Sequence, residues 1–178
     1  MTVSLDALDD ETFKQINDVD YPASRVLDGI DNARSAGFSE IKVNAVVRRG
    51  FNEHAVLDLV DYFRGTGCIV RFIEYMDVGE TNGWNLDDVI PARELISQID
   101  AKYPVEPISP NYQGEVAKRW RFRDDQGEIG FITSVTESFC GDCSRARLSA
   151  VGKIYTCLFA SDGHDLRMLV RSGASDSD

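Results

Sequence analysis

The chain has 178 residues, of which 43% are hydrophobic and 28% charged, which is the composition of a globular protein with one domain or one domain and a small appendage. The formal net charge of −11 argues against a nucleic-acid-binding surface, because phosphate contacts need a basic patch. No apolar run is long enough to cross a bilayer, and the acidic N-terminal stretch lacks a secretion signal. We therefore expect a cytoplasmic protein whose thiols stay reduced and free to bind metal.

The first hundred residues alternate between strand and helix patterns. Strands are expected at 2–5, 41–47 and 68–75 because apolar residues there alternate or run continuously. Helices are expected near 11–16 and after Pro22, Asn52 and Pro91. Proline suits the first position of a helix, and asparagine suits the capping position before it. The order of these elements predicts β-α units and an α/β sheet.

The pattern changes after Pro104. Residues 105–114 are irregular and contain two further prolines. Residues 120–123 and 128–135 read as a β-hairpin around the turn 124–127. We therefore place a boundary near residue 105, between an α/β part (1–104) and a β-rich part (105–178).

Two strands carry polar residues whose positions point to a site. In the strand 41–47, Lys42 and Asn44 lie on the face opposite the apolar residues, which fits a barrel or an α/β sheet with a site inside. A solvated edge lysine is the alternative interpretation of Lys42. In the next strand, Arg71 and Glu74 interrupt an apolar run, and buried charges need partners, so each should be paired or face a ligand.

Met76 stands at the end of the strand 68–75. Ligands of α/β folds bind at this end of the strands, although a methionine is more often core filler. Cys68 begins the same strand, and packing explains it sufficiently.

Three of the four cysteines lie close together near the C-terminus. Cys140 and Cys143 form a C-x-x-C pair, and thirteen residues separate Cys143 from Cys157. That interval accommodates a strand, a turn at 151–153 and a returning strand, so a hairpin would bring Cys157 back to the pair. Three thiolates suit zinc or iron–sulfur chemistry.

Spacing alone does not choose between the two metals. His164 follows Cys157 by seven positions and would close a four-ligand structural zinc site. Three protein ligands would instead leave an open position for a ligand. A disulfide framework is the weakest interpretation, because four cysteines in 178 residues is a low density.

Arg145 and Arg147 follow the C-x-x-C pair at a spacing of two. If residues 146–150 are extended, both guanidiniums point to one face. Two fixed cations beside an open metal position suggest an anionic ligand, whereas two solvated strand residues are the alternative.

Four segments together resemble one family. Val-Ser-Leu-Asp-Ala-Leu, Lys-Val-Asn-Ala-Val-Val, Arg-Phe-Ile-Glu-Tyr-Met and Phe-Cys-Gly-Asp-Cys-Ser-Arg-Ala-Arg-Leu are similar, in this order, to segments of the molybdenum cofactor biosynthesis protein A family. Its members are radical S-adenosylmethionine GTP cyclases. The resemblance runs through essentially the whole chain.

The resemblance implies a fold, a site and cofactors. Residues 1–104 would be the second half of an incomplete TIM-like (α/β)6 barrel, and residues 105–178 a β-rich C-terminal iron–sulfur segment. Cys140, Cys143 and Cys157 would hold a [4Fe-4S] cluster whose fourth iron site meets the guanine of GTP. The implied GTP contacts are Lys42, Arg71, Arg145, Ala146 and Arg147. The implied S-adenosylmethionine contacts are Ser4 and Met76.

The resemblance also implies an activity. The family's GTP 3',8-cyclase is a lyase that converts GTP to 3',8-cyclo-7,8-dihydro-GTP by radical chemistry on S-adenosylmethionine, and it needs a second [4Fe-4S] cluster on a C-x-x-x-C-x-x-C motif. This chain has no cysteine before Cys68, so we expect an internal fragment that is inactive alone. We also expect self-association through the open edge strand 2–5.

Two other interpretations stay open. A radical S-adenosylmethionine enzyme that modifies peptides could carry a similar auxiliary cluster. A zinc-stabilised binding module using His164 would not be an enzyme at all.

Overall fold

The computed structural model describes residues 1–77, 83–138, 140–143 and 145–175. The chain divides into two compact units. The first comprises Met1–Met76 and Gly83–Phe139, and the second comprises Asp77–Asn82 and Cys140–Asp178.

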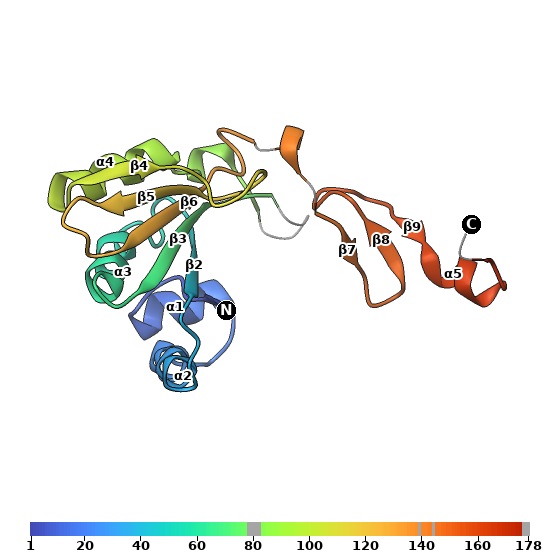
Figure 1. The fold of residues 1–178 in the computed structure, drawn as a ribbon, viewed down its shortest axis with the longest axis horizontal. Helices are drawn as coiled ribbons and strands as arrows, with labels where there is room; N and C mark the ends of the chain where they lie inside the picture. Colours follow the sequence, from blue (N-terminus) through green and yellow to red (C-terminus); the bar gives the residue numbers. More distant parts are fainter. Residues whose placement is uncertain (78–82, 139, 144, 176–178) are drawn as a thin grey trace. The chain divides into compact units, whose positions relative to one another are not determined.

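The first unit is a mixed six-stranded sheet with four α-helices (Figure 1). Its elements are β1 Thr2–Ser4, α1 Asp10–Asn17, α2 Ala23–Ser35, β2 Ile41–Val47, α3 Ala55–Phe63, β3 Cys68–Glu74, η1 Leu86–Asp88, α4 Ala92–Lys102, β4 Val105–Ile108, β5 Lys118–Phe122 and β6 Glu128–Ile132. The strand order is β1-β2-β3-β6-β5-β4. The pairs β1-β2, β2-β3 and β3-β6 are parallel, whereas β6-β5 and β5-β4 are antiparallel. The prediction of an α/β sheet is therefore confirmed.

The central strands β2 and β3 show why the sheet has two different faces. In both, buried and half-buried residues alternate along the whole strand. The buried set, which includes Val43 and Phe72, joins one hydrophobic core with side chains of the helices, such as Leu59 of α3 and Ile99 of α4. The other face carries the half-buried set, in which Lys42, Asn44 and Arg71 lie among apolar residues such as Ile69, so one face is covered and the partly polar face is left for a site. No described helix is long and apolar enough to cross a membrane.

The loop between β2 and α3 corrects one prediction. Asn52 does not cap α3 with its side chain; the capping position is held by His54, which makes no side-chain capping hydrogen bond. The buried amide of Asn52 instead donates to the carbonyl oxygens of Asp6 and Val46, at 3.0 and 2.8 Å, and accepts from the N–H of Arg48. Asn52 therefore links the segment after β1 to the end of β2. It lies within the turn of residues 51–54 and not directly before the helix.

Asp6 lies beside this tie and makes stability depend on pH. Its carboxylate is buried and accepts the N–H of Val46 at 2.8 Å. Burial raises the pKa of Asp6 above its usual value, and the hydrogen bond only partly opposes this. The folded state therefore binds the proton more tightly than the unfolded state, so Asp6 stabilises the fold at low pH and loses this effect as pH rises through its raised pKa.

We predict that Asp6→Asn raises the free energy of unfolding at pH 7 by about 1 kcal/mol, because it removes a buried charge and keeps an acceptor for Val46. Urea unfolding at several pH values checks this result. The gain should shrink as pH falls through the raised pKa of Asp6, because the wild-type carboxyl then takes up a proton. A gain that grows towards low pH would contradict the assignment.

Residues 105–139 correct the expected arrangement of the β-rich part. The predicted β5-β6 hairpin is confirmed, with its turn containing Asp125 and Gly127 at φ of 58° and 109°. The second strand of this hairpin, β6, pairs in parallel with β3, so the hairpin belongs to the six-stranded sheet. The compact units separate after residue 139, and β4 runs in the same direction as β3 and β6, whereas β5 between β4 and β6 runs against both. The stretch 105–114, predicted to be irregular, contains the edge strand β4. Pro107 is tolerated there because an edge strand pairs on one side only.

The second unit is a three-stranded antiparallel sheet followed by a short helix. Its elements are η2 Cys140–Asp142, β7 Arg147–Leu148, β8 Lys153–Tyr155, β9 His164–Asp165 and α5 Leu166–Arg171. The predicted hairpin is confirmed, since Arg147 and Leu148 pair with Tyr155 and Ile154. Gly152 makes the turn at a φ of 80°. Among described residues 140–175, none is buried, and large apolar side chains such as Leu148 and Val170 are exposed. This unit therefore has no hydrophobic core of its own in the described residues.

Candidate functional site

The cysteine segment surrounds the β7-β8 hairpin. Cys140 opens η2, Cys143 lies four residues before β7, and Cys157 follows β8 by two residues. All three are exposed, and all four cysteines of the chain are free thiols. The disulfide interpretation is therefore wrong for this structure, and the thiols are available to a metal. Cys68 is buried at the start of β3, as packing predicts.

Cys140, Cys143 and Cys157 have side chains that bind metals, but the structure does not place the three sulfurs around one metal position. Within the described ranges, no group of three or more His, Cys, Asp or Glu side chains is close enough to hold a metal ion. The β7-β8 hairpin therefore forms as predicted, but it does not by itself bring the three sulfurs close enough together to bind one metal ion. The same finding applies to the zinc set with His164, which lies in β9 opposite Ile154.

Cys143 has the most distinctive thiol of the segment. Nη2 of Arg145 lies 3.6 Å from its sulfur and donates a hydrogen bond to it. The pKa of Cys143 is lowered, first by the backbone N–H of Arg145, then by the guanidinium of the same residue and by the charge of Arg147. Both predicted arginines therefore act on one cysteine, and they favour the thiolate that a metal binds.

We predict that Arg145→Leu slows alkylation of Cys143 by iodoacetamide about threefold at pH 7, because the thiolate fraction falls when the cation is removed. The effect is limited because the backbone N–H of Arg145 remains. Peptide mass spectrometry measures the rate at each cysteine. Arg147→Leu is the control and should have a smaller effect, since Arg147 acts through charge alone. A larger effect of Arg147→Leu would contradict this ranking.

The first unit holds the other predicted site residues on or near its sheet. Ser4 of β1 aligns with Asn44 of β2, and Asn44 aligns with Arg71 of β3. Lys42 lies two residues before Asn44, on the same face. Met76 lies two residues beyond the end of β3. The sheet thus brings Ser4 and Arg71 to one row, and the roles of these residues in binding stay predictions.

Lys42 and Arg71 differ in how their charges are satisfied. Lys42 forms an ion pair with Glu40 at 2.8 Å. Arg71 donates from Nε to Asn44 Oδ1 at 2.9 Å and from Nη2 to Thr2 Oγ1 at 3.4 Å, and both acceptors are neutral. The structure records no ion pair of Arg71 with a described carboxylate within 4.0 Å. Arg71 is therefore paired, as expected of a charge in this strand, by two neutral acceptors, and a ligand facing it stays a prediction.

Glu74, the second charge in this strand, is 3% exposed and is satisfied without a cation. Its carboxylate accepts the N–H groups of Ala92, Val135 and Thr136 at 3.2, 2.9 and 2.8 Å, and the Thr136 hydroxyl at 2.5 Å. The donors come from the first residue of α4 and from the segment after β6. Glu74 thus links the start of α4 and the segment after β6 to the end of β3. The expectation that this charge is paired is confirmed.

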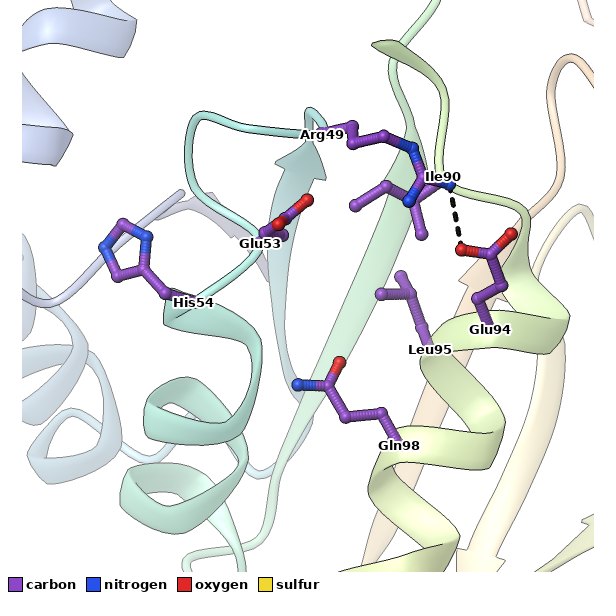
Figure 2. Close-up of a pocket in the computed structure, with 7 residues that line it drawn as sticks. All are labelled: Arg49, Glu53, His54, Ile90, Glu94, Leu95 and Gln98. Carbon is purple, nitrogen blue, oxygen red and sulfur yellow. Dashed lines mark hydrogen bonds and ion pairs between the residues drawn. The ribbon is translucent and has the colours of Figure 1, made fainter. Parts of the chain in front are cut away.

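A separate cavity of about 410 Å³ lies between α3 and α4. Figure 2 shows Arg49 reaching across it to Glu94, with which it forms an ion pair at 2.8 Å. Ile90 and Leu95 also line it, and His54 points away toward the left of the view. None of the predicted site residues lines this cavity. The guanidinium of Arg49 is already paired with Glu94, so we assign the cavity no role.

Sequence reasoning missed the residues that support Arg71. Asn44 was noted only for its face, and neither Thr2 nor Gly130 was singled out. A glycine inside the apolar run 128–135 was the available signal, since a glycine in a strand often marks a close approach.

The fold and the site define an α/β protein that carries an exposed three-cysteine segment flanked by two arginines. Residues 68–178 match the family model described as Molybdenum Cofactor Synthesis C. The chain belongs to this family.

Relatives extend the similarity to the whole chain. The chain is 54% identical to a GTP 3',8-cyclase of Acidothermus cellulolyticus, over 99% of its own length and 49% of that protein. It is 48% identical to a GTP 3',8-cyclase of Staphylococcus epidermidis, over 100% of the chain and 52% of the relative. It is 50% identical to one from Xanthomonas axonopodis pv. citri, over 97% and 52%. The chain spans about half the length of the curated relatives it matches.

Proposed function

We propose that this chain is part of a GTP 3',8-cyclase, a radical S-adenosylmethionine lyase of molybdenum cofactor biosynthesis that converts GTP to 3',8-cyclo-7,8-dihydro-GTP. The observation that carries the proposal is identity of about half of all residues, across nearly the whole chain, to proteins of that name. The chemistry of the cysteine segment and of the polar sheet face agrees with it.

Cys140, Cys143 and Cys157 would hold a [4Fe-4S] cluster. When bound, such a cluster with one iron lacking a protein ligand can bind the guanine of GTP. The thiols are exposed and free, and Arg145 and Arg147 favour the thiolate of Cys143. Because the second unit has no buried residue in its described part, metal binding would also supply folding free energy to it. Gathering of the sulfurs would then accompany binding of the cluster.

The cationic residues would hold the triphosphate. Arg145 and Arg147, with the backbone of Ala146 between them, form one candidate set, and Lys42 and Arg71 on the sheet form the other. Arginine suits this task because its planar guanidinium binds phosphate oxygens in pairs. Lys42 would exchange its ion pair with Glu40 for a phosphate.

Ser4 and Met76 would contact S-adenosylmethionine at the carboxyl ends of β1 and β3. Ligands of parallel sheets bind at these ends. The cysteines of a second cluster would have to come from residues outside this chain, which has none before Cys68. We extend the proposal to the fold: residues 1–104 would form half of an incomplete (α/β)6 barrel, and 105–178 the segment that carries the auxiliary cluster. Self-association through the edge of β1 stays a prediction.

Equilibrium dialysis of the anaerobically reconstituted chain with GTP, ATP and a small peptide library tests the proposal. We expect GTP to bind at least about tenfold more tightly than ATP, because the open iron position would bind groups of guanine that adenine lacks. Weak GTP binding together with peptide binding would favour a peptide-modifying enzyme and overturn the proposal.

A further inference from the structure

We propose that Asn44 is a positioning residue which, together with Gly130, lays the Arg71 guanidinium across the polar face of the sheet as a receptor for a phosphate chain. The identity of the ligand as a nucleotide rests on the proposed function, whereas the phosphate chemistry follows from Arg71 and its surroundings.

The register of four neighbouring strands places Arg71 between Asn44 and Gly130. Ser4 of β1, Asn44 of β2, Arg71 of β3 and Gly130 of β6 are successive partners in one row across three parallel pairs. Aligned residues of neighbouring strands point to the same face of a sheet. Arg71 therefore has an amide on one side and a glycine on the other.

The side chain of Asn44 directly contacts the Arg71 guanidinium. Nε of Arg71 donates to Asn44 Oδ1 at 2.9 Å, and Nη2 reaches Thr2 Oγ1 at 3.4 Å. These acceptors direct the guanidinium toward β1 through two neutral oxygens. A carboxylate at either position would orient the group equally well but would cancel its charge. Asparagine therefore orients Arg71 and keeps it able to attract an anion.

On the other side of Arg71, Gly130 leaves space for the arginine stem. A Cβ at this position would lie 3.0 Å from Cγ of Arg71 and 3.4 Å from Cβ of Ala117. Its backbone is ordinary strand, with no positive φ, so the close approach of Arg71, and not backbone conformation, favours the glycine. With an added Cβ here, the stem of Arg71 would have to shift by a few tenths of an ångström.

The charge of Arg71 is only partly balanced by its surroundings. Burial lowers the pKa of Arg71, and attraction from Tyr112, Glu115 and Glu40 partly opposes this. The two carboxylates are engaged elsewhere, Glu40 with Lys42 at 2.8 Å and Glu115 with the N–H of Asn111 at 2.6 Å. A half-buried cation without a counter-ion among the described residues favours binding of an anion. Phosphate suits a guanidinium best, because it can accept two hydrogen bonds.

Asn44→Asp separates positioning from structural support. The substitution puts a carboxylate beside Nε of Arg71, so the fold should be at least as stable as that of Asn44→Ala, which loses the contact. Affinity for phosphate should move the other way. We expect Asn44→Asp to weaken binding of inorganic triphosphate about tenfold and Asn44→Ala about threefold. Calorimetric titration of the 178-residue chain measures affinity, and urea unfolding measures stability.

Asn111→Asp is the matched control. Asn111 Oδ1 accepts from Nη1 of Arg119 at 2.7 Å in the same sheet unit, but Arg119 is already paired with Glu128. Asn111→Asp changes the net charge by the same amount as Asn44→Asp, but away from Arg71, so affinity for triphosphate should stay within about twofold of wild type.

Gly130→Ala is an independent variant. It should weaken triphosphate binding while leaving the amides of Asn44 and Asn111 in place.

The outcomes distinguish this inference from the proposed function. Equal affinity of Asn44→Asp and wild type for triphosphate, or no binding by wild type, would overturn the inference. If wild type binds GTP no better than triphosphate while Asn44→Asp loses affinity, the inference stands and the nucleotide assignment fails.

Discussion

Glu74→Gln should lower the free energy of unfolding by about 3 kcal/mol, because the buried carboxylate satisfies three backbone N–H groups and one hydroxyl. Glutamine keeps one acceptor oxygen but turns an NH2 group toward those donors. The loss should exceed that of Thr136→Val, which removes a single donor and should cost about 1 kcal/mol. Urea unfolding measures both values.

Glu94→Gln is the control for Glu74. Glu94 is exposed and pairs with Arg49 at 2.8 Å, so its substitution should cost less than about 1 kcal/mol. If Glu74→Gln is no more destabilising than Glu94→Gln, the carboxylate does not fasten α4 and the segment after β6 to the sheet.

Serine at Cys140, Cys143 or Cys157 should each remove most of the bound iron. A cluster needs all of its thiolate ligands, and the chain outside this segment offers only Cys68. We expect iron after anaerobic reconstitution to fall to about a tenth of the wild-type content in each variant, since a missing ligand leaves the site incomplete. Colorimetric iron and sulfide assays measure this.

Cys68→Ala is the matched control for the three serine variants. Cys68 is a buried thiol at the start of β3, so its loss changes packing but should leave the iron content unchanged. Retention of wild-type iron by any one of the three serine variants would exclude that cysteine as a ligand. Retention of metal by His164→Ala would argue separately against the zinc interpretation.

The strands could be predicted where burial alternates strictly. β2 was predicted with its observed bounds, because every second residue from Ile41 to Val47 is apolar and buried. β4 was missed because Pro107 makes the segment look irregular, and only its position at the edge of the sheet permits a proline. The pairing of β6 with β3 could not be predicted either, since no local pattern of residues shows which strands are neighbours in a sheet.

The site could be predicted as a set of residue types and less well as an arrangement. The C-x-x-C spacing and the hairpin indicated metal ligands, but the distance between sulfurs depends on contacts that no spacing encodes. Glu74 was correctly expected to need partners, although they are N–H groups from two distant segments, one of them more than sixty residues further along the chain. The support of Arg71 by Asn44 depends on the register of β2 and β3, which a single sequence does not reveal.

Anaerobic iron and sulfide content of the reconstituted chain, measured with and without GTP, tests the iron–sulfur centre most directly. A three-cysteine [4Fe-4S] centre predicts about four iron and four sulfide per chain, and a change in the Mössbauer signal of one iron when GTP is added. Zinc without sulfide, or an iron signal that GTP leaves unchanged, would contradict it.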